Sequence, residues 1–256
     1  MTSPLAGRHA LVTGGGRGIG LAIARALLNE GARLTLLGRD RARLESSAQG
    51  LAGEVGIVAA DVADATQVAA AFAAARVRGG RIDILVNNAG QATSKPLTRT
   101  EAAFWEQMLA VNLTGTFLCS QQALPDMIEG GFGRIVNIAS TAGLTGYAYC
   151  TAYCAAKHGV VGFTRALARE VATRNITVNA VCPGYTETDI IRDAVTNIRT
   201  KTGRSEQEAI ASLVASNPQG RFVQPEEVAS AVAWLCLPGS ASVTGQSIGI
   251  SGGETQ

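Results

Sequence analysis

Short apolar runs that alternate with helix-length segments constrain the fold of this chain more than any other feature. Parallel strands need a crossover connection, usually a helix, and are buried on both faces. Strands are predicted at His9–Thr13, Arg33–Leu37, Gly56–Ala60, Ile82–Asn87, Arg134–Ala139, Thr177–Val181 and Gln246–Ile250. Helices are predicted at Gly18–Glu30, Arg39–Gly50, Ala65–Val77, Glu101–Ile128, Ala152–Arg174 and Pro225–Leu235. The alternation predicts an α/β fold with a doubly wound, seven-stranded parallel sheet and helices on both faces.

The composition is typical of one well-covered domain, which we expect to span residues 1–256. Charged residues make up 16% of the chain, against about 25% in ordinary soluble proteins, and no linker or repeat divides it. The 22 basic and 20 acidic residues give a net charge of +2 and form no basic stripe for a nucleic-acid backbone. We therefore expect no nucleic-acid partner.

The chain shows no sign of targeting or of metal binding. The first residues lack a basic stretch followed by an apolar run of about 7–15 residues, and no run approaches about 18 apolar residues. We therefore expect no membrane segment and a cytoplasmic location. The five cysteines are an odd number without a C-x-x-C pair, which favours reduced thiols. Two histidines without further ligands at suitable spacing predict no metal site.

Residues 184–224 separate the last two predicted strands by more than a crossover helix requires. The middle of this segment has a helical but polar, threonine-rich pattern. Long loops in compact domains are usually lids or binding elements. We therefore expect an insertion that covers the substrate, and the alternative is a pair of surface helices without a role.

A glycine-rich loop, Thr13–Gly20, directly follows the first predicted strand and opens the first predicted helix. Glycine permits positive φ angles and a close approach of the backbone, so the amide N–H groups and the positive helix end can meet a pyrophosphate. This context predicts a dinucleotide site. The loop residues expected to bind the cofactor are Gly14, Gly16, Arg17, Gly18, Ile19 and Gly20.

A second candidate site lies in residues 135–156, which include no charged side chain and are followed directly by Lys157. Ser140 follows a predicted strand at its carboxyl end, where open α/β sheets bind ligands. Tyr153 and Lys157 are four residues apart and so share one helix face. A tyrosine needs nearby positive charge to act as an acid or base at neutral pH, because its ordinary pKa is near 10. We expect Tyr153 to protonate a carbonyl oxygen held by Ser140 while hydride reaches the carbon.

These motifs resemble those of the short-chain dehydrogenase/reductase family over nearly the whole chain. The resemblance rests on the spacing T-G-x3-G-x-G, the N-N-A-G motif ending at Gly90, and Ser140 followed by the Y-x-x-x-K of Tyr153 and Lys157. The resemblance implies a Rossmann-type domain. Within the family, the sequence is most similar in overall pattern to the β-ketoacyl reductase and 3-hydroxyacyl dehydrogenase branch. It also implies a homotetramer whose interfaces come from the C-terminal segment and the two longest helices.

The resemblance assigns roles to further residues. Asn112 matches the family's fourth catalytic position, which holds a water that links the lysine to solvent. The pattern P-G-x3-T after the sixth strand implies binding of the nicotinamide carboxamide. The implied cofactor-binding residues outside the glycine loop are Gly38, Arg39, Asp61, Val62, Asn88, Ala89, Gly90, Tyr153, Lys157, Pro183, Gly184, Thr186 and Thr188.

The choice between NADP and NAD depends on the end of the second predicted strand. There Gly38 occupies the position at which NAD-dependent members of the family carry an acidic residue. Arg39 and Arg17 could both reach a 2′-phosphate, which favours NADP. Asp40 leaves NAD open, because it could bind a ribose hydroxyl, although it could equally cap the following helix.

The sequence thus predicts an oxidoreductase that transfers hydride between NADP(H) and a carbonyl or secondary alcohol, including 3-oxoacyl compounds and related ketones. One alternative is an NAD-dependent dehydrogenase of a small hydroxy compound. A third reading, a non-catalytic NADP-binding regulator, would not need the set Asn112, Ser140, Tyr153 and Lys157.

Overall fold

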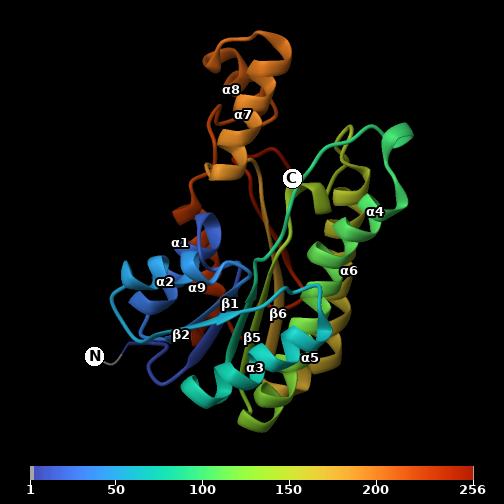
Figure 1. Ribbon diagram of the computed structural model, residues 1–256. Helices are drawn as coiled ribbons and strands as arrows, with labels where there is room; N and C mark the ends of the chain where they lie inside the picture. The colour runs from blue at the N-terminus through green and yellow to red at the C-terminus, as the bar shows by residue number, and fades with distance from the viewer. Residues whose placement is uncertain (1–2, 256) are drawn as a thin grey trace.

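The computed structural model describes residues 3–255 and contains a seven-stranded sheet in which every pair of neighbours is parallel (Figure 1). The strand order is β3-β2-β1-β4-β5-β6-β7. The strands are β1 (His9–Thr13), β2 (Arg33–Gly38), β3 (Val55–Ala59), β4 (Ile84–Asn87), β5 (Gly133–Ile138), β6 (Ile176–Pro183) and β7 (Ser247–Ile250). All seven predicted strands are confirmed, with ends that differ by at most two residues. The order reverses between β1 and β4, so the carboxyl ends of these two strands flank a crevice of the kind that binds ligands in doubly wound sheets.

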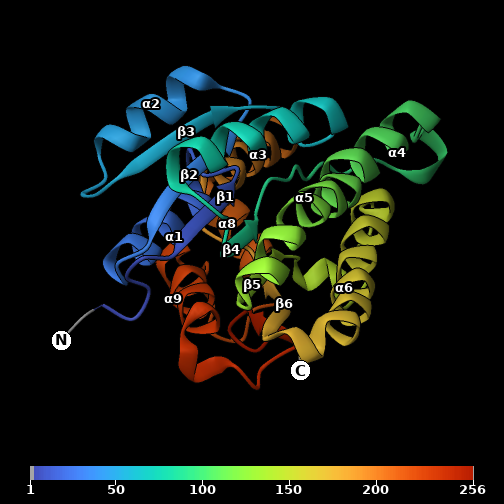
Figure 2. The same cartoon turned by 90° about the horizontal axis from the view of Figure 1, so that it is seen from below.

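Helices cover both faces of the sheet, as predicted (Figure 2). The α-helices are α1 (Gly18–Asn29), α2 (Arg41–Gln49), α3 (Ala65–Gly79), α4 (Ala102–Leu109), α5 (Gly115–Gly130), α6 (Thr151–Val171), α7 (Asp189–Thr202), α8 (Glu206–Val214) and α9 (Pro225–Cys236). One face carries α1 and α9, and the other carries α3, α5 and α6. Each face has its own apolar core, one including Ile23 of α1 and Val232 of α9, the other Phe72 of α3 and Met127 of α5.

The single helix predicted at Glu101–Ile128 is wrong in one respect, because a π-helical turn at Ala110–Thr114 divides it into α4 and α5. The side chain of Asn112 donates from Nδ2 to the Met108 carbonyl, at 3.0 Å, and so occupies a backbone acceptor of the helix. Apolar periodicity does not reveal such a turn, because the helical pattern continues through it. π turns often occur at functional sites.

The segment 184–224 contains α7 and α8, which project beyond the carboxyl ends of the strands (Figure 1). The segment that follows β7 lies at the same end of the molecule. Within residues 3–255, no helix is both long and apolar enough to cross a bilayer.

Candidate active site

The glycine-rich loop runs between β1 and α1 with its backbone closely packed. Gly14 has φ +63°, and a Cβ there would lie 2.9 Å from Asn88 Nδ2. A Cβ at Gly20 would collide with the Gly14 carbonyl oxygen. Only glycine fits these two positions, so the loop presents bare backbone at the amino end of α1. This is the geometry that a phosphate group requires.

The end of β4 is tied to the glycine-rich loop through Thr13. The hydroxyl of Thr13 accepts hydrogen bonds from the backbone N–H groups of Asn88 and Ala89, each at 2.9 Å. The Asn88 amide donates to the carbonyls of Thr13 and Gly14, at 3.0 and 3.2 Å. These bonds cross the point at which the strand order reverses, so they hold both walls of the crevice in register.

The two arginines expected to bind a 2′-phosphate, Arg39 after β2 and Arg17 in the glycine-rich loop, are exposed. Arg39, with 70% of its side chain exposed, lies 3.9 Å from Asp61, and Arg17, with 53% exposed, lies 3.8 Å from Asp189. Both pairs are long and solvated, so either guanidinium group can change partner at little cost. Asp40 instead caps α2, because its carboxylate accepts the N–H of Arg43 at 3.0 Å. That bond favours capping over the alternative role of Asp40 at a ribose.

Sequence reasoning missed Arg43. A Cβ at Gly16 would lie 3.5 Å from Arg43 Cγ, so the arginine passes directly beside the loop, and its guanidinium group is 3.6 Å from Asp40. The available signal was its place in the first turn of α2, directly after the residues expected to select the cofactor.

The other expected cofactor-binding residues lie along the same edge of the sheet. Gly38 and Pro183 end β2 and β6. Asp61 accepts the N–H of Ala63 at 3.0 Å, and Val62 is buried against Gly115. Ile19 packs against the core on the α1 and α9 face, and Ala89 packs against the core on the other face. The N–H of Gly184 donates to the Ile250 carbonyl at 3.0 Å, at the end of β7. Thr186 is buried, and a Cβ at Gly18 would lie 3.2 Å from Thr188 Cγ2.

Ser140, Tyr153 and Lys157 come together where β5 ends and α6 begins. Ser140 follows β5, and its hydroxyl accepts the N–H of Ala142 at 3.1 Å. Burial raises the pKa of Tyr153 to about 12, against the opposing effect of a hydrogen bond with Ser140. Lys157 is 4% exposed, and its Nζ donates to the Ile138 carbonyl at 2.8 Å and lies 5.7 Å from the centre of the Tyr153 ring. Burial lowers the pKa of Lys157 to about 8.

Asn112 joins this group from the π-helical turn. Its Oδ1 accepts the N–H of Gln91 at 3.2 Å, and its Nδ2 donates to the Gln91 carbonyl at 3.0 Å. A Cβ at Gly90 would lie 2.8 Å from Asn112 Oδ1 and 3.7 Å from Lys157 Nζ. The structure therefore brings Asn112, Gly90 and Lys157 into one compact cluster beside Tyr153.

A carboxylate from the C-terminal segment lies next to the same site, and sequence reasoning missed it. Tyr147 donates from its hydroxyl to Glu254 Oε1 at 2.6 Å, and its ring meets that of Tyr185 edge to face, with centroids 6.4 Å apart. Burial is the main cause of a strongly raised pKa of Tyr147, to which the bond to Glu254 adds. No local pattern links Tyr147 to Glu254, because they are 107 residues apart.

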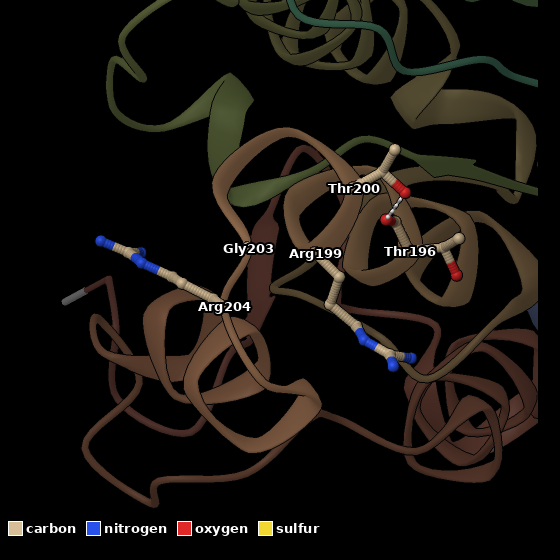
Figure 3. Close-up of a pocket in the computed structure, with 5 residues that line it drawn as sticks. All are labelled: Thr196, Arg199, Thr200, Gly203 and Arg204. Carbon is tan, nitrogen blue, oxygen red and sulfur yellow. Dashed lines mark hydrogen bonds between the residues drawn. The ribbon is translucent and has the colours of Figure 1, made fainter.

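An open hollow of about 400 Å³ lies on the projecting α7–α8 arm. It is lined by Thr196, Arg199, Thr200, Gly203 and Arg204. Figure 3 shows that the guanidinium groups of Arg199 and Arg204 point away from each other, and Arg199 pairs with Glu206 at 3.2 Å. The two arginines do not converge on a single point, and none of the expected site residues lines this hollow.

Comparison with known proteins identifies the family. Residues 8–199 match the family model of short chain dehydrogenases. The protein belongs to the short-chain dehydrogenase family. This confirms the resemblance inferred from the motifs. The observed seven-stranded parallel sheet agrees with the Rossmann-type fold that this resemblance implied.

Similar proteins cover the whole length of the chain. A crystal structure of a variant of actinorhodin polyketide ketoreductase with NADPH matches with a TM-score of 0.93 and 41% identity, over 99% of both chains. A 3-oxoacyl-acyl-carrier-protein reductase of Aquifex aeolicus is 40% identical over 99% of each chain. The 2-(S)-hydroxypropyl-CoM dehydrogenase 3 of Xanthobacter autotrophicus is 41% identical over 100% of this chain and 99% of its own.

Proposed function

We propose that this protein is an NADPH-dependent reductase of ketones, with 3-oxoacyl compounds and related ketones as its substrate class. The observation that carries the proposal is the cluster of Ser140, Tyr153, Lys157 and Asn112 at the carboxyl edge of the sheet, beside the bare backbone of the glycine loop. Two relatives are named reductases of ketoacyl or polyketide substrates, and one of them was solved with NADPH.

The residues present fit a dinucleotide. Gly14 and Gly20 leave no room for side chains, so backbone N–H groups at the start of α1 are free to approach phosphate oxygens. The nicotinamide end would be held by the residues at the end of β6 and just after it, which are Pro183, Gly184, Thr186 and Thr188. The adenosine half and the floor of the crevice would be formed by the residues that follow β3 and β4, which are Asp61, Val62, Asn88, Ala89 and Gly90. When bound, the nicotinamide supplies the hydride.

Tyr153 and Ser140 would act on the substrate oxygen. The pKa of Tyr153 is raised, so the phenol carries its proton at neutral pH and can donate it to a carbonyl oxygen that becomes an alkoxide. Ser140 holds that oxygen by donating a hydrogen bond. The two donors together stabilise the negative charge that develops there.

Lys157 and Asn112 would restore the proton of Tyr153. With a pKa lowered to about 8, Lys157 can release a proton near neutral pH more easily than an exposed lysine. Asn112 lies within the same cluster, through Gly90, and would position a water between Lys157 and solvent. Tyr153 and Lys157 would also contact the nicotinamide ribose.

Preference for NADP over NAD rests on positive charge and on the role of Asp40. Arg39 and Arg17 are solvated and weakly paired, and Asp40 is engaged in capping α2. A 2′-phosphate would meet guanidinium groups rather than a competing carboxylate at the end of β2. An NAD-dependent dehydrogenase of a hydroxy compound is the alternative, and the relative named 2-(S)-hydroxypropyl-CoM dehydrogenase supports a hydroxy compound as substrate.

The proposal includes a cytoplasmic homotetramer that requires no further partner for its reaction. The insertion at 184–224 would cover the bound ketone, because α7 and α8 project beyond the edge at which Ser140 and Thr188 lie.

The deciding experiment compares Tyr153→Phe with the unchanged protein. Loss of the acidic hydroxyl should lower kcat by about 10²-fold or more, while NADPH binding, measured by fluorescence titration, stays within a few-fold. The assay follows absorbance of the reduced nicotinamide with a panel of ketones and 3-oxoacyl thioesters, using NADPH and NADH in parallel. A panel that gives no turnover, or a variant with unchanged kcat, would refute the proposed function.

A further inference from the structure

We propose that Glu254 makes the substrate site selective for ketones that carry no negative charge near the carbonyl group; this rests on the proposed function. Glu254 follows β7, and its N–H donates to the Ser251 carbonyl at 3.3 Å, which turns the C-terminal segment back over the carboxyl edge of the sheet. A Cβ at Gly184 would lie 3.0 Å from Glu254 Oε2. The carboxylate therefore lies against the segment that follows β6, where the nicotinamide end of the cofactor is proposed to bind.

Two hydroxyl groups bind this carboxylate, and a third contacts one of them. Its Oε1 accepts hydrogen bonds from Tyr147 and from Ser216, each at 2.6 Å. The Tyr147 oxygen is also 2.8 Å from Thr141 Oγ1, and since the phenol has one proton, which it gives to the carboxylate, Thr141 must donate to Tyr147. A chain of oriented hydroxyls thus runs from the residue after Ser140 to Glu254.

The negative charge of Glu254 is not neutralised by a neighbouring cation. Among the residues that the structure describes, the carboxylate takes part in no ion pair within 4.0 Å. The cation of the catalytic cluster, Lys157, is buried and donates to the Ile138 carbonyl. Hydroxyl donors stabilise a carboxylate but leave its charge in place, so a second anion nearby is repelled.

Glu254 lies close enough to the proposed acid for this charge to act on a substrate. Its Oε1 is 2.6 Å from the Tyr147 hydroxyl, which is 2.8 Å from the hydroxyl of Thr141, the residue next to Ser140. Tyr185 packs edge to face against Tyr147, with ring centroids 6.4 Å apart. A ketone held by Ser140 and Tyr153 would therefore have Tyr147 and Glu254 beside it. An amide, ester or thioester is tolerated there, whereas a free carboxylate is disfavoured.

The test compares two substrates of the same shape, 3-oxobutanoate and 3-oxobutanamide, which differ in charge. The unchanged protein should prefer the amide in kcat/KM. Glu254→Gln keeps the side-chain shape and removes the charge, so we expect the ratio of kcat/KM for the amide to that for the acid to fall by about tenfold, the effect of a modest like-charge repulsion in a partly screened site. The matched control is Glu226→Gln in the first turn of α9, which removes the same charge elsewhere and should leave the ratio unchanged.

Two outcomes would overturn the inference. An unchanged ratio in Glu254→Gln would show that the charge does not select substrates, and an equal loss on both substrates would show that Glu254 only holds the C-terminal segment and Ser216 in place. Binding of the unreactive analogues butanoate and butanamide to the NADPH complex, measured by calorimetry, gives the same ratio without turnover. If neither ketone is reduced, the proposed function fails, and the ratio of the two dissociation constants still decides the role of Glu254.

Discussion

At the scale of single residues, the site combines groups whose environments move their pKa values in opposite directions. Burial raises the pKa of Tyr153 and lowers that of Lys157. Each shift favours the neutral form of its group, and both follow from the same apolar setting, in which residues 135–156 supply no charge. The Tyr153 phenol, which keeps its proton at neutral pH, thus lies beside the Lys157 ammonium group, which can lose one.

Arg39 gives a prediction about the cofactor. Arg39→Asp should raise the KM for NADPH by tenfold or more, because a charged contact to the 2′-phosphate is lost and replaced by repulsion. The matched control is Arg41→Asp, which changes the same charge on α2 at a residue that pairs with Glu45 at 3.1 Å. Steady-state kinetics with NADPH and NADH measure both, and equal effects of the two variants would remove Arg39 from the site.

Lys157 gives a prediction about stability. Its pKa falls from an ordinary 10.5 to about 8 through burial, which at about 1.4 kcal/mol per unit corresponds to a cost of roughly 3 kcal/mol for holding the charged form in the fold. The unfolded state binds more protons between these two pKa values. The cost is therefore complete below pH 8 and disappears as the pH rises toward 10.5.

Lys157→Met should accordingly abolish turnover and raise the free energy of unfolding by about 1–2 kcal/mol at pH 7, since the Ile138 carbonyl loses its donor and offsets part of the gain. The gain should shrink at pH 10. Urea unfolding at the two pH values measures it, with Lys201→Met on the exposed side of α7 as control. A variant less stable than the unchanged protein at pH 7 would contradict this account.

At the scale of elements, α5 is fixed to the sheet and to α3 by Asp126. Its two carboxylate oxygens share the Nε–H of Arg76, at 2.9 and 3.0 Å, and one of them also accepts the N–H of Ile82 at 3.0 Å. The Asp126 side chain is 11% exposed, so two donors depend on one nearly buried carboxylate. The contact between Arg76 and Asp126 joins two helices through residues that are 50 positions apart in the chain.

Asp126→Ala should lower the free energy of unfolding by about 2–4 kcal/mol, because it leaves a partly buried cation and a buried N–H without their acceptor. Glu129→Ala is the control on the same helix: its side chain is 74% exposed and lies 3.5 Å from Arg81, so the change should be within about 0.5 kcal/mol. Chemical denaturation with both variants tests the contrast, and similar losses would argue against an anchoring role of Asp126.

At the scale of the whole molecule, large apolar side chains remain exposed on α4 and α5, in the range proposed to form a tetramer interface, and also on α9. Trp105 of α4 and Phe117 of α5 are 38% and 44% exposed, and Trp234 of α9 is 47% exposed. Large apolar groups on a surface are typical of association sites. The protein should therefore sediment with about four times the mass of one chain.

Phe117→Glu should shift the sedimentation profile toward smaller species, because an ionised carboxylate would have to be desolvated in the interface. Val77→Glu makes a comparable change on α3, at a side chain that is 88% exposed and lies outside the proposed interface helices, and should leave the profile unchanged. A monomeric unchanged protein would refute the tetramer.

The sequence by itself determined the strands, the helix order, the family and the dinucleotide and Y-x-x-x-K motifs. Each of these features depends on residues that are close together in the sequence, because local backbone geometry sets the apolar periodicity and the positions that need glycine. The sequence also allowed the catalytic residues to be grouped, because Ser140 follows a strand and Tyr153 and Lys157 share one face of the next helix. The π-helical turn could not be predicted, because a side chain bond of Asn112 to Met108 leaves the apolar pattern intact.

Only the tertiary structure decided which distant residues meet. It assigned Asp40 to the cap of α2, placed Arg43 beside the glycine loop, and joined Glu254 to Tyr147 across 107 residues. It also set the pKa shifts of Tyr153 and Lys157, which depend on burial by segments from several parts of the chain. The physical reason is that packing of the sheet and its helices fixes these neighbours, and no short-range pattern in the sequence records them.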